Sequence, residues 1–125
     1  MSYDWGPRFI VPSDVLKTYS GNVLLREEYD EELLQKEISE MGFTGRVSHI
    51  SNPWYFRKKD ETTWILIGES QDEQRYFPVN WKTSGLENGR YEIMGLMHVF
   101  LEDAETGTGR AIARESIVEV TVENG

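Results

Sequence analysis

The chain has 125 residues, of which 38% are hydrophobic, 12% aromatic and 28% charged, a size and composition typical of one folded globular domain rather than a disordered chain. The formal net charge is −9, so the average field repels phosphate backbones and anionic lipid headgroups, and we expect neither nucleic acid nor membrane insertion. The absence of cysteine excludes disulfides, thiolate metal ligands and cysteine nucleophiles.

The chain has no feature that assigns a compartment. No apolar run approaches the roughly 18 residues of a membrane span, and the first residues lack the basic start and apolar core of a secretory signal. A disulfide-free fold is stable in reducing and in oxidising surroundings. The localisation is therefore unknown from the residues alone.

The first part of the chain predicts two strands. Residues 1–20 contain two prolines among turn formers, which predicts an extended lead-in with a short edge strand. Residues 21–29 predict a better strand, because apolar and polar residues alternate there. One face of that strand carries Val23, Leu25 and Glu27.

After residue 29 the spacing of the apolar residues changes from the two-residue period of a strand to that of a helix. Leu34, Ile38 and Met41 follow one another at intervals of four and three residues, and Gly42 is a natural terminator. We therefore expect one short amphipathic helix at residues 30–41. A helix of this length is marginal in isolation, so its apolar stripe must rest on another part of the fold.

The rest of the chain predicts strand after strand, separated by turn signals. These strands are expected at residues 46–59, 62–70, 75–81, 89–102 and 113–123. With the two strands before the helix they make about seven. Many short strands and one helix favour an all-β, antiparallel sandwich rather than an α/β fold.

Three short motifs resemble one family. Ser20-Gly21 precedes the second strand, a Trp-x-Thr-x-x-Leu-x-x-Gly-x-Tyr pattern occupies residues 81–91, and Val120, Val122 and Asn124 end the chain. In this order they resemble the bacterial immunoglobulin-like modules appended to exported glycosidases, proteases and adhesins. The resemblance implies one immunoglobulin-like domain over residues 1–125, in an extracellular or cell-envelope protein.

The residues of the 81–91 motif have clear folding roles. Gly89 supplies a backbone position suited to positive φ, and Leu86 plugs the end of the core. Tyr91 can donate a hydrogen bond backward across the corner, as tyrosines do in such sandwiches. These residues predict a fold and no reaction.

Catalytic and metal signals are weak. His49 and His98 are far apart in sequence, and a site near His98 would need them to meet a carboxylate. A small enzyme with that site is one alternative. The acidic loop at residues 102–109 offers oxygen ligands for calcium but lacks the spacing of a dedicated calcium loop. We therefore expect no cofactor and no catalytic residue.

The apolar surplus of the predicted strand at residues 91–100 points beyond folding. Alternation leaves one set of its residues facing outward: Met94, Leu96, His98 and Phe100. A half-solvated antiparallel strand should be polar on that side. Either the helix covers this face, or the face contacts a protein partner or a second copy of the chain.

A cluster of aromatic residues offers a further alternative. Trp54, Tyr55 and Trp64 belong to one predicted hairpin, and flat rings can hold sugars, although cores and interfaces use the same residues. The leading hypothesis is a non-catalytic interaction, assembly or spacer module that accompanies a larger exported enzyme or surface protein. The first alternative is a carbohydrate-binding module that uses these three rings.

Overall fold

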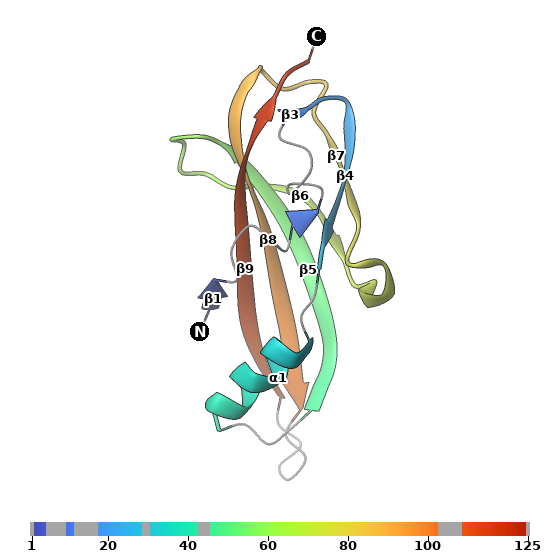
Figure 1. The fold of residues 1–125 in the computed structure, drawn as a ribbon, viewed down its shortest axis with the longest axis vertical. Coiled ribbons are helices and arrows are strands. Elements are labelled where there is room, and N and C mark those ends of the chain that lie inside the picture. The colour runs from blue at the N-terminus through green and yellow to red at the C-terminus, as the bar shows by residue number, and fades with distance from the viewer. Residues whose placement is uncertain are drawn as a thin grey trace.

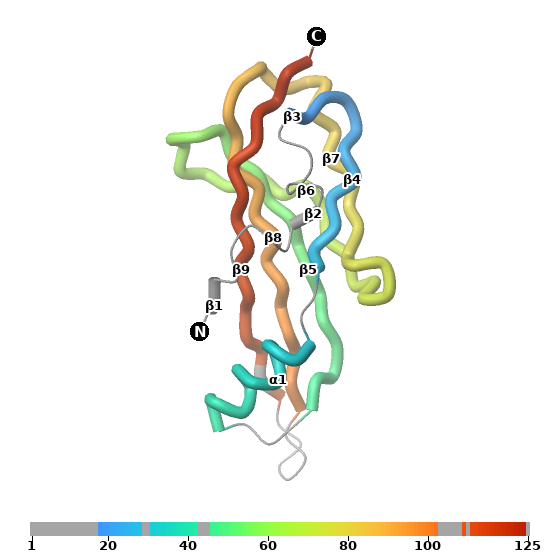
Figure 2. The backbone as a smooth tube through the Cα atoms, viewed as in Figure 1, coloured from blue at the N-terminus to red at the C-terminus, as the bar shows by residue number. Residues whose placement is uncertain are grey.

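The computed structural model describes residues 2–4, 10–11, 18–28, 31–42, 46–102 and 109–124. Within these ranges the chain is mostly β-strand, with one short α-helix, as the sequence predicts. Three long strands run along the length of the molecule (Figure 2). None of the described helices is long and apolar enough to cross a membrane.

The larger sheet is built on the three long strands. β5 (Arg46–Lys58), β8 (Gly89–Glu102) and β9 (Gly109–Val122) pair antiparallel in the order β9-β8-β5. β6 (Ile65–Ser70) extends the sheet on the β5 side and returns from β5 as an antiparallel hairpin. The hairpin predicted for these two strands therefore forms.

Two very short strands complete the larger sheet. β1 (Ser2–Asp4) and β3 (Thr18–Tyr19) both pair with β9, and both run parallel to it. The prediction of a purely antiparallel fold is therefore wrong, because this sheet is mixed. Strands of two or three residues leave no alternation pattern that sequence reasoning could read.

The smaller sheet contains β2 (Ile10–Val11), β4 (Asn22–Glu27) and β7 (Val79–Lys82), all antiparallel in the order β2-β4-β7. β4 follows the predicted alternation, with Val23, Leu25 and Glu27 buried and Leu24 exposed. The strand predicted at 75–81 forms only from Val79, because residues before it belong to a short 3-10 helix, η2 (Glu73–Arg75), and a turn.

The helix α1 (Glu31–Glu40) lies within the predicted range, and Gly42, two residues after its end, has a φ of +74°. Figure 1 shows α1 against one end of the long strands, with β4 and β7 toward the other end, where β9 finishes. The same face of the larger sheet is thus covered by the smaller sheet along part of its length and by the helix along the rest. We call this face the inner face, and the opposite one the outer face.

Two hydrophobic clusters fill the space above the inner face. The sheet cluster joins the two sheets and contains Tyr19, Val23, Leu25, Trp54, Trp81, Tyr91, Ile93, Val118, Val120 and Val122. The helix cluster lies beneath α1 and contains Leu34, Ile38, Ile50, Phe77, Met97, Val99, Leu101 and Ile112. Burial of these side chains is the main source of stability for the domain.

The position of α1 corrects one expectation. The helix was one of two candidates to cover the outward residues of β8, but Leu34 and Ile38 pack on Met97 and Val99, which belong to the inner face. The helix therefore does not account for the apolar residues on the outer face of β8. The short connection from Glu27 to Glu31 keeps the helix on the side of the sheet where β4 ends.

The motif at residues 81–91 forms the corner that the sequence predicts. Tyr91 donates its hydroxyl to the carbonyl of Glu87 at 2.8 Å, and Gly89 has a φ of +146°. Trp81 is buried in the sheet cluster, while Leu86 packs against that cluster from its edge. The folding roles expected for these residues are confirmed.

The end of the chain is tied to the same corner. The backbone amide and hydroxyl of Thr83 both donate to the carbonyl of Gly21, each at 2.8 Å. The side-chain amide of Asn124 donates to the carbonyls of Thr83 at 2.7 Å and Leu86 at 3.2 Å. These hydrogen bonds hold together three segments that are far apart in sequence.

Candidate functional site

The outer face carries most of the residues that the sequence singled out. Tyr55 pairs with Leu66 on one side and with Met94 on the other, and Met94 pairs with Ile117. Because directly paired residues share a face, these four side chains form a row across β6, β5, β8 and β9. Leu66 is 59% exposed, Tyr55 and Ile117 are half-buried, and Met94 is buried. We call them the apolar row.

The predicted contact residues continue this row along β8. Leu96, His98 and Phe100 are all half-buried on the outer face. The ring of Phe100 stacks on the imidazole of His49, with 4.3 Å between the ring centres and 13° between their planes. The predicted set therefore lies on one face, although Met94 is too buried to be a principal contact by itself.

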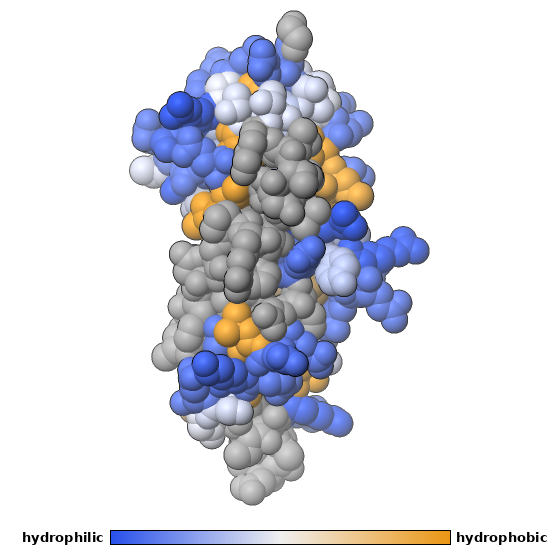
Figure 3. Space-filling model, viewed as in Figure 1, coloured by the Kyte–Doolittle hydropathy of each residue, from blue (hydrophilic) through white to orange (hydrophobic). Residues whose placement is uncertain are grey.

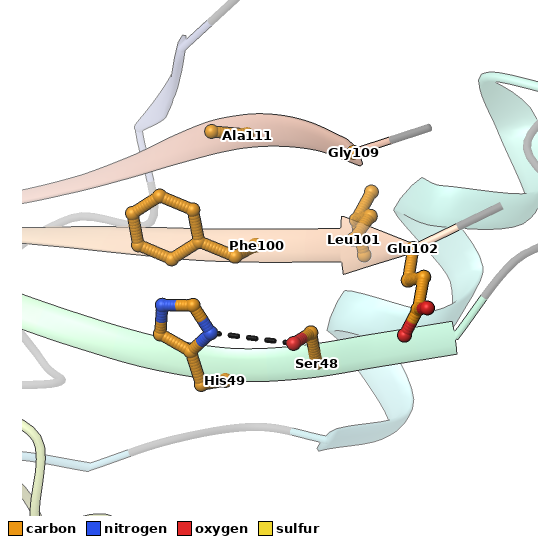
Figure 4. Close-up of a pocket in the computed structure, with 7 residues that line it drawn as sticks. All are labelled: Ser48, His49, Phe100, Leu101, Glu102, Gly109 and Ala111. Carbon is orange, nitrogen blue, oxygen red and sulfur yellow. Dashed lines mark hydrogen bonds between the residues drawn. The ribbon is translucent and has the colours of Figure 1, made fainter. Parts of the chain in front are cut away.

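A shallow depression of about 520 Å³ lies at the end of this face nearest α1 (Figure 4). It is lined by Ser48, His49, Phe100, Leu101, Glu102, Gly109 and Ala111. In Figure 4 the rings of His49 and Phe100 lie side by side on neighbouring strands, and Ser48 lies beside the imidazole. The depression thus combines an aromatic pair with a few polar groups.

Among the described residues of this face, no hydroxyl, imidazole and carboxylate form a connected hydrogen-bonded set. The Ser48 hydroxyl lies 3.3 Å from Nδ1 of His49, but among the described residues no carboxylate hydrogen-bonds to that imidazole to orient it. The register brings His98 next to Ser51, yet the Ser51 hydroxyl donates to Glu69 instead. Within the part of the chain that the structure describes, the two histidines share a face, but no carboxylate hydrogen-bonds to either ring.

The described residues also contain no group of three or more histidine, aspartate or glutamate side chains that could hold a metal ion. The calcium loop considered at residues 102–109 lies largely outside the described residues. Calcium binding by this loop, the less favoured alternative, is therefore not tested by the described residues.

The proposed sugar platform is wrong for one of its three rings. Trp54 is fully buried and its Nε1 donates to the carbonyl of Phe77 at 3.0 Å. Tyr55, the next residue of the strand, points to the opposite, outer face. Trp64 packs against the guanidinium of Arg57, 4.1 Å from the ring centre. Without Trp54 the three rings cannot form one stacking surface.

A buried polar layer separates the two hydrophobic clusters, and sequence reasoning found only part of it. Its members are Glu27, Glu37, Asn52, Arg114 and Ser116, all buried. The pattern of β4 placed Glu27 inward. Arg114 was missed, although it occupies an inward position of β9 two residues from Ser116. The signal was the alternation of β9, which continues through this charged residue.

Arg114 and Glu37 form a buried ion pair that ties α1 to β9. Arg114 is fully buried, and Glu37 is 8% exposed. Removing one member of such a pair leaves a charge in the interior, so each residue depends on the other. This pair links α1 to β9 in the interior, beside the packing of Leu34 and Ile38.

Glu27 is the more unusual member of the polar layer. Its carboxyl group lies against Gly95, where an added Cβ would be 2.9 Å from Oε2. Burial raises its pKa to about 8, although Ser116 and Asn52 lie close enough to favour the charged form. Among the described residues neither makes a well-aligned hydrogen bond to it. Neutral Glu27 is therefore the form that fits this site near neutral pH.

Comparisons with protein-family models, with curated protein sequences and with solved structures found no match for this chain. The function is therefore argued from the geometry of the described residues.

Proposed function

We propose that this chain is a non-catalytic, immunoglobulin-like module that binds a protein partner on its outer face. The immunoglobulin-like arrangement is supported by the tyrosine corner at Tyr91, by the two sheets packed around Trp81, and by the resemblance of residues 81–91 to such modules. That resemblance also supports a place beside a larger exported enzyme or surface protein.

The observation that carries the binding proposal is the apolar row together with Leu96 and Phe100. Antiparallel sheets with one solvated face normally alternate apolar-in and polar-out. Here the outer face stays apolar across four strands, and Leu66 is 59% exposed. An apolar centre with an aromatic pair at one end is the usual composition of a protein interface.

The charges at the sides of this surface select the partner. Glu69 on β6 and Glu115 on β9 flank Leu96, and among the described residues neither forms an ion pair. A second copy of this chain, with its net charge of −9, would bring more carboxylates to the same interface. The fitting partner is a protein with an apolar centre and lysine or arginine residues on both sides.

Selection from a random peptide display library tests this proposal without knowledge of the natural partner. Peptides are selected on the wild type and depleted on Leu96→Lys, which changes a half-buried outer residue. We expect the surviving peptides to combine apolar residues with lysine or arginine. Lys36→Glu, on the exposed side of α1, is the control and should retain all of them.

Two results would contradict the proposal. One is that no selected peptide survives the depletion, which would mean that every peptide bound by the wild type also binds Leu96→Lys. The other is a wild type that sediments as a dimer and becomes a monomer on Leu96→Lys, which would make the partner a second copy. Equal melting temperatures of the wild type and Leu96→Lys would confirm that the substitution acts on binding and not on folding.

A further inference from the structure

A second surface lies on the smaller sheet, on the side away from the core. It is a groove of about 600 Å³, lined by Leu24, Arg26, Gln74, Arg75, Tyr76, Pro78, Val79 and Asn80. In Figure 3 a hydrophobic area lies over β4 and β7 and borders hydrophilic side chains that project over the segment before β7. The groove is separate from the outer face of the larger sheet.

The backbone at one end of this groove is held in an unusual conformation. Tyr76 and Phe77 have φ values of +62° and +54°, which non-glycine residues rarely adopt. Such strain persists only where the surrounding structure holds it, and it concentrates at functional sites. The pair Tyr76–Phe77 is therefore a feature that needs an explanation.

Several hydrogen bonds hold this strained segment. The amide of Phe77 donates to the carbonyl of Asp72 at 2.9 Å, and the amide of Glu27 donates to the carbonyl of Tyr76 at the same distance. Trp54 also anchors the carbonyl of Phe77. The Phe77 side chain is fully buried, whereas Tyr76 is 44% exposed. The segment thus presents a tyrosine ring at a fixed position beside the groove.

The charge of the groove is opposite to that of the chain. The bond between Glu27 and Tyr76 brings the neighbouring Arg26 and Arg75 to the same end of the groove. Among the described residues Arg26 forms no ion pair, and Arg75 has only a contact of 3.7 Å with Asp72, in which both side chains are exposed. Exposed pairs of this kind are weak, so both guanidinium groups are available to an anion.

The other end of the groove is apolar and open. Leu24 is 50% exposed, and Pro78 lies in the lining of the groove. Sites for small molecules usually enclose most of the ligand surface. A groove whose apolar residue and tyrosine are each about half exposed leaves a small ligand in water, but it suits a longer chain that lies across it.

We propose that this groove binds an acidic peptide segment, with its carboxylates at Arg26 and Arg75 and an apolar side chain over Leu24 and against Tyr76. Arginine is suited to this role because its planar guanidinium binds carboxylates in a bidentate manner. The side-chain amides of Gln74 and Asn80 lie in the lining, where they can bond a peptide backbone.

Fluorescence anisotropy with three labelled peptides of equal length tests the proposal. One contains aspartate and leucine, one aspartate and serine, and one lysine and leucine. We expect the first to bind, the second to bind at least about tenfold more weakly, and the third not to bind. Absence of binding by the first peptide at about 1 mM would overturn the proposal.

Variants locate the binding. Arg26→Glu and Arg75→Glu should each weaken binding of the aspartate-leucine peptide at least about tenfold. The matched control is Lys82→Glu, which makes the same charge change. Lys82 lies on the same face of β7 as Asn80 but outside the groove lining. If Lys82→Glu weakens binding as much as Arg26→Glu, the peptide is held by the average charge of that face and the proposal is wrong.

A further variant separates binding from folding. Tyr76→Gly removes the ring and introduces a residue that adopts the left-handed backbone without strain. It should weaken binding of the peptide, while the melting temperature stays at or above that of the wild type. Sedimentation completes the test. A wild-type dimer that Arg26→Glu dissociates would show a second copy as the occupant and would overturn the peptide proposal.

Discussion

Replacing Glu27 with glutamine tests the protonation state of the most unusual group in the core. The carboxyl group is fully buried, and burial raises its pKa from 4.5 to about 8. The pH at which the unfolded chain releases this proton is therefore far below the pH at which the folded chain does. Glu27→Gln keeps the shape of the neutral carboxyl group and removes its titration, so the two proteins should differ in how stability depends on pH.

The sign and size of this dependence follow from the two pKa values. Below pH 4.5 both states hold the proton, so the contribution of Glu27 to stability is fully present. Between pH 4.5 and about 8 the unfolded state releases the proton while the folded state keeps it, and stability falls by about 1.4 kcal/mol for each pH unit. Above pH 8 the loss is complete, at roughly 5 kcal/mol.

Thermal unfolding at two pH values measures the effect. From pH 5.5 to 7.5 the wild type should lose about 3 kcal/mol, which corresponds to about 10 °C in melting temperature for a domain of this size. Glu27→Gln should lose much less over the same range. Glu28→Gln is the control, because Glu28 is the next residue and is exposed, and it should keep the pH dependence of the wild type.

The comparison isolates Glu27 from other titrating groups. Both histidines are present in the variant and in the control, so they contribute equally to all three proteins. Ion pairs with Lys58 and Lys59 lower the pKa values of Glu87 and Glu119, so their contribution is lost only as pH falls below the range of the assay. An unchanged pH dependence in Glu27→Gln would refute the assignment of a neutral, buried carboxyl group.

Two further predictions concern the polar layer. Gly95→Ala should lower stability by about 1–3 kcal/mol, because its Cβ would meet the buried Glu27 carboxyl group. Urea unfolding measures this cost, and a smaller cost of the same change in a Glu27→Ala background would confirm the cause. Arg114→Ala should cost about 3–5 kcal/mol by leaving Glu37 without its cation. Hydrogen exchange of α1 checks this, since amides that stay as protected as in the wild type would contradict the anchoring role.

Features that depend on neighbouring residues were predictable from the sequence. The alternation of β4 placed Glu27 inward, the spacing of Leu34 and Ile38 placed the helix, and Tyr91 bonds backward as expected. Each of these signals is contained in a short segment. The side-chain period of a strand, the period of a helix and the geometry of a tight corner are set by local backbone sterics.

The candidate surface was predictable in part. Alternation along β8 placed Leu96, His98 and Phe100 on one face, but it could not show which strands lie beside them. The pairing of Met94 with Ile117 and with Tyr55 joins residues far apart in sequence, and only the register of the folded sheet brings them into one row.

The amino-acid order alone determined that the chain is mostly β, which residues of β8 share a face, and that one short helix lies within residues 30–41. The tertiary structure decided which face the helix covers, that Arg114 meets Glu37 in the interior, and that Arg26 and Arg75 lie at one end of a groove. The physical reason is the range of the interactions: local sterics act within a few residues, whereas burial and ion pairing depend on which distant segments pack together.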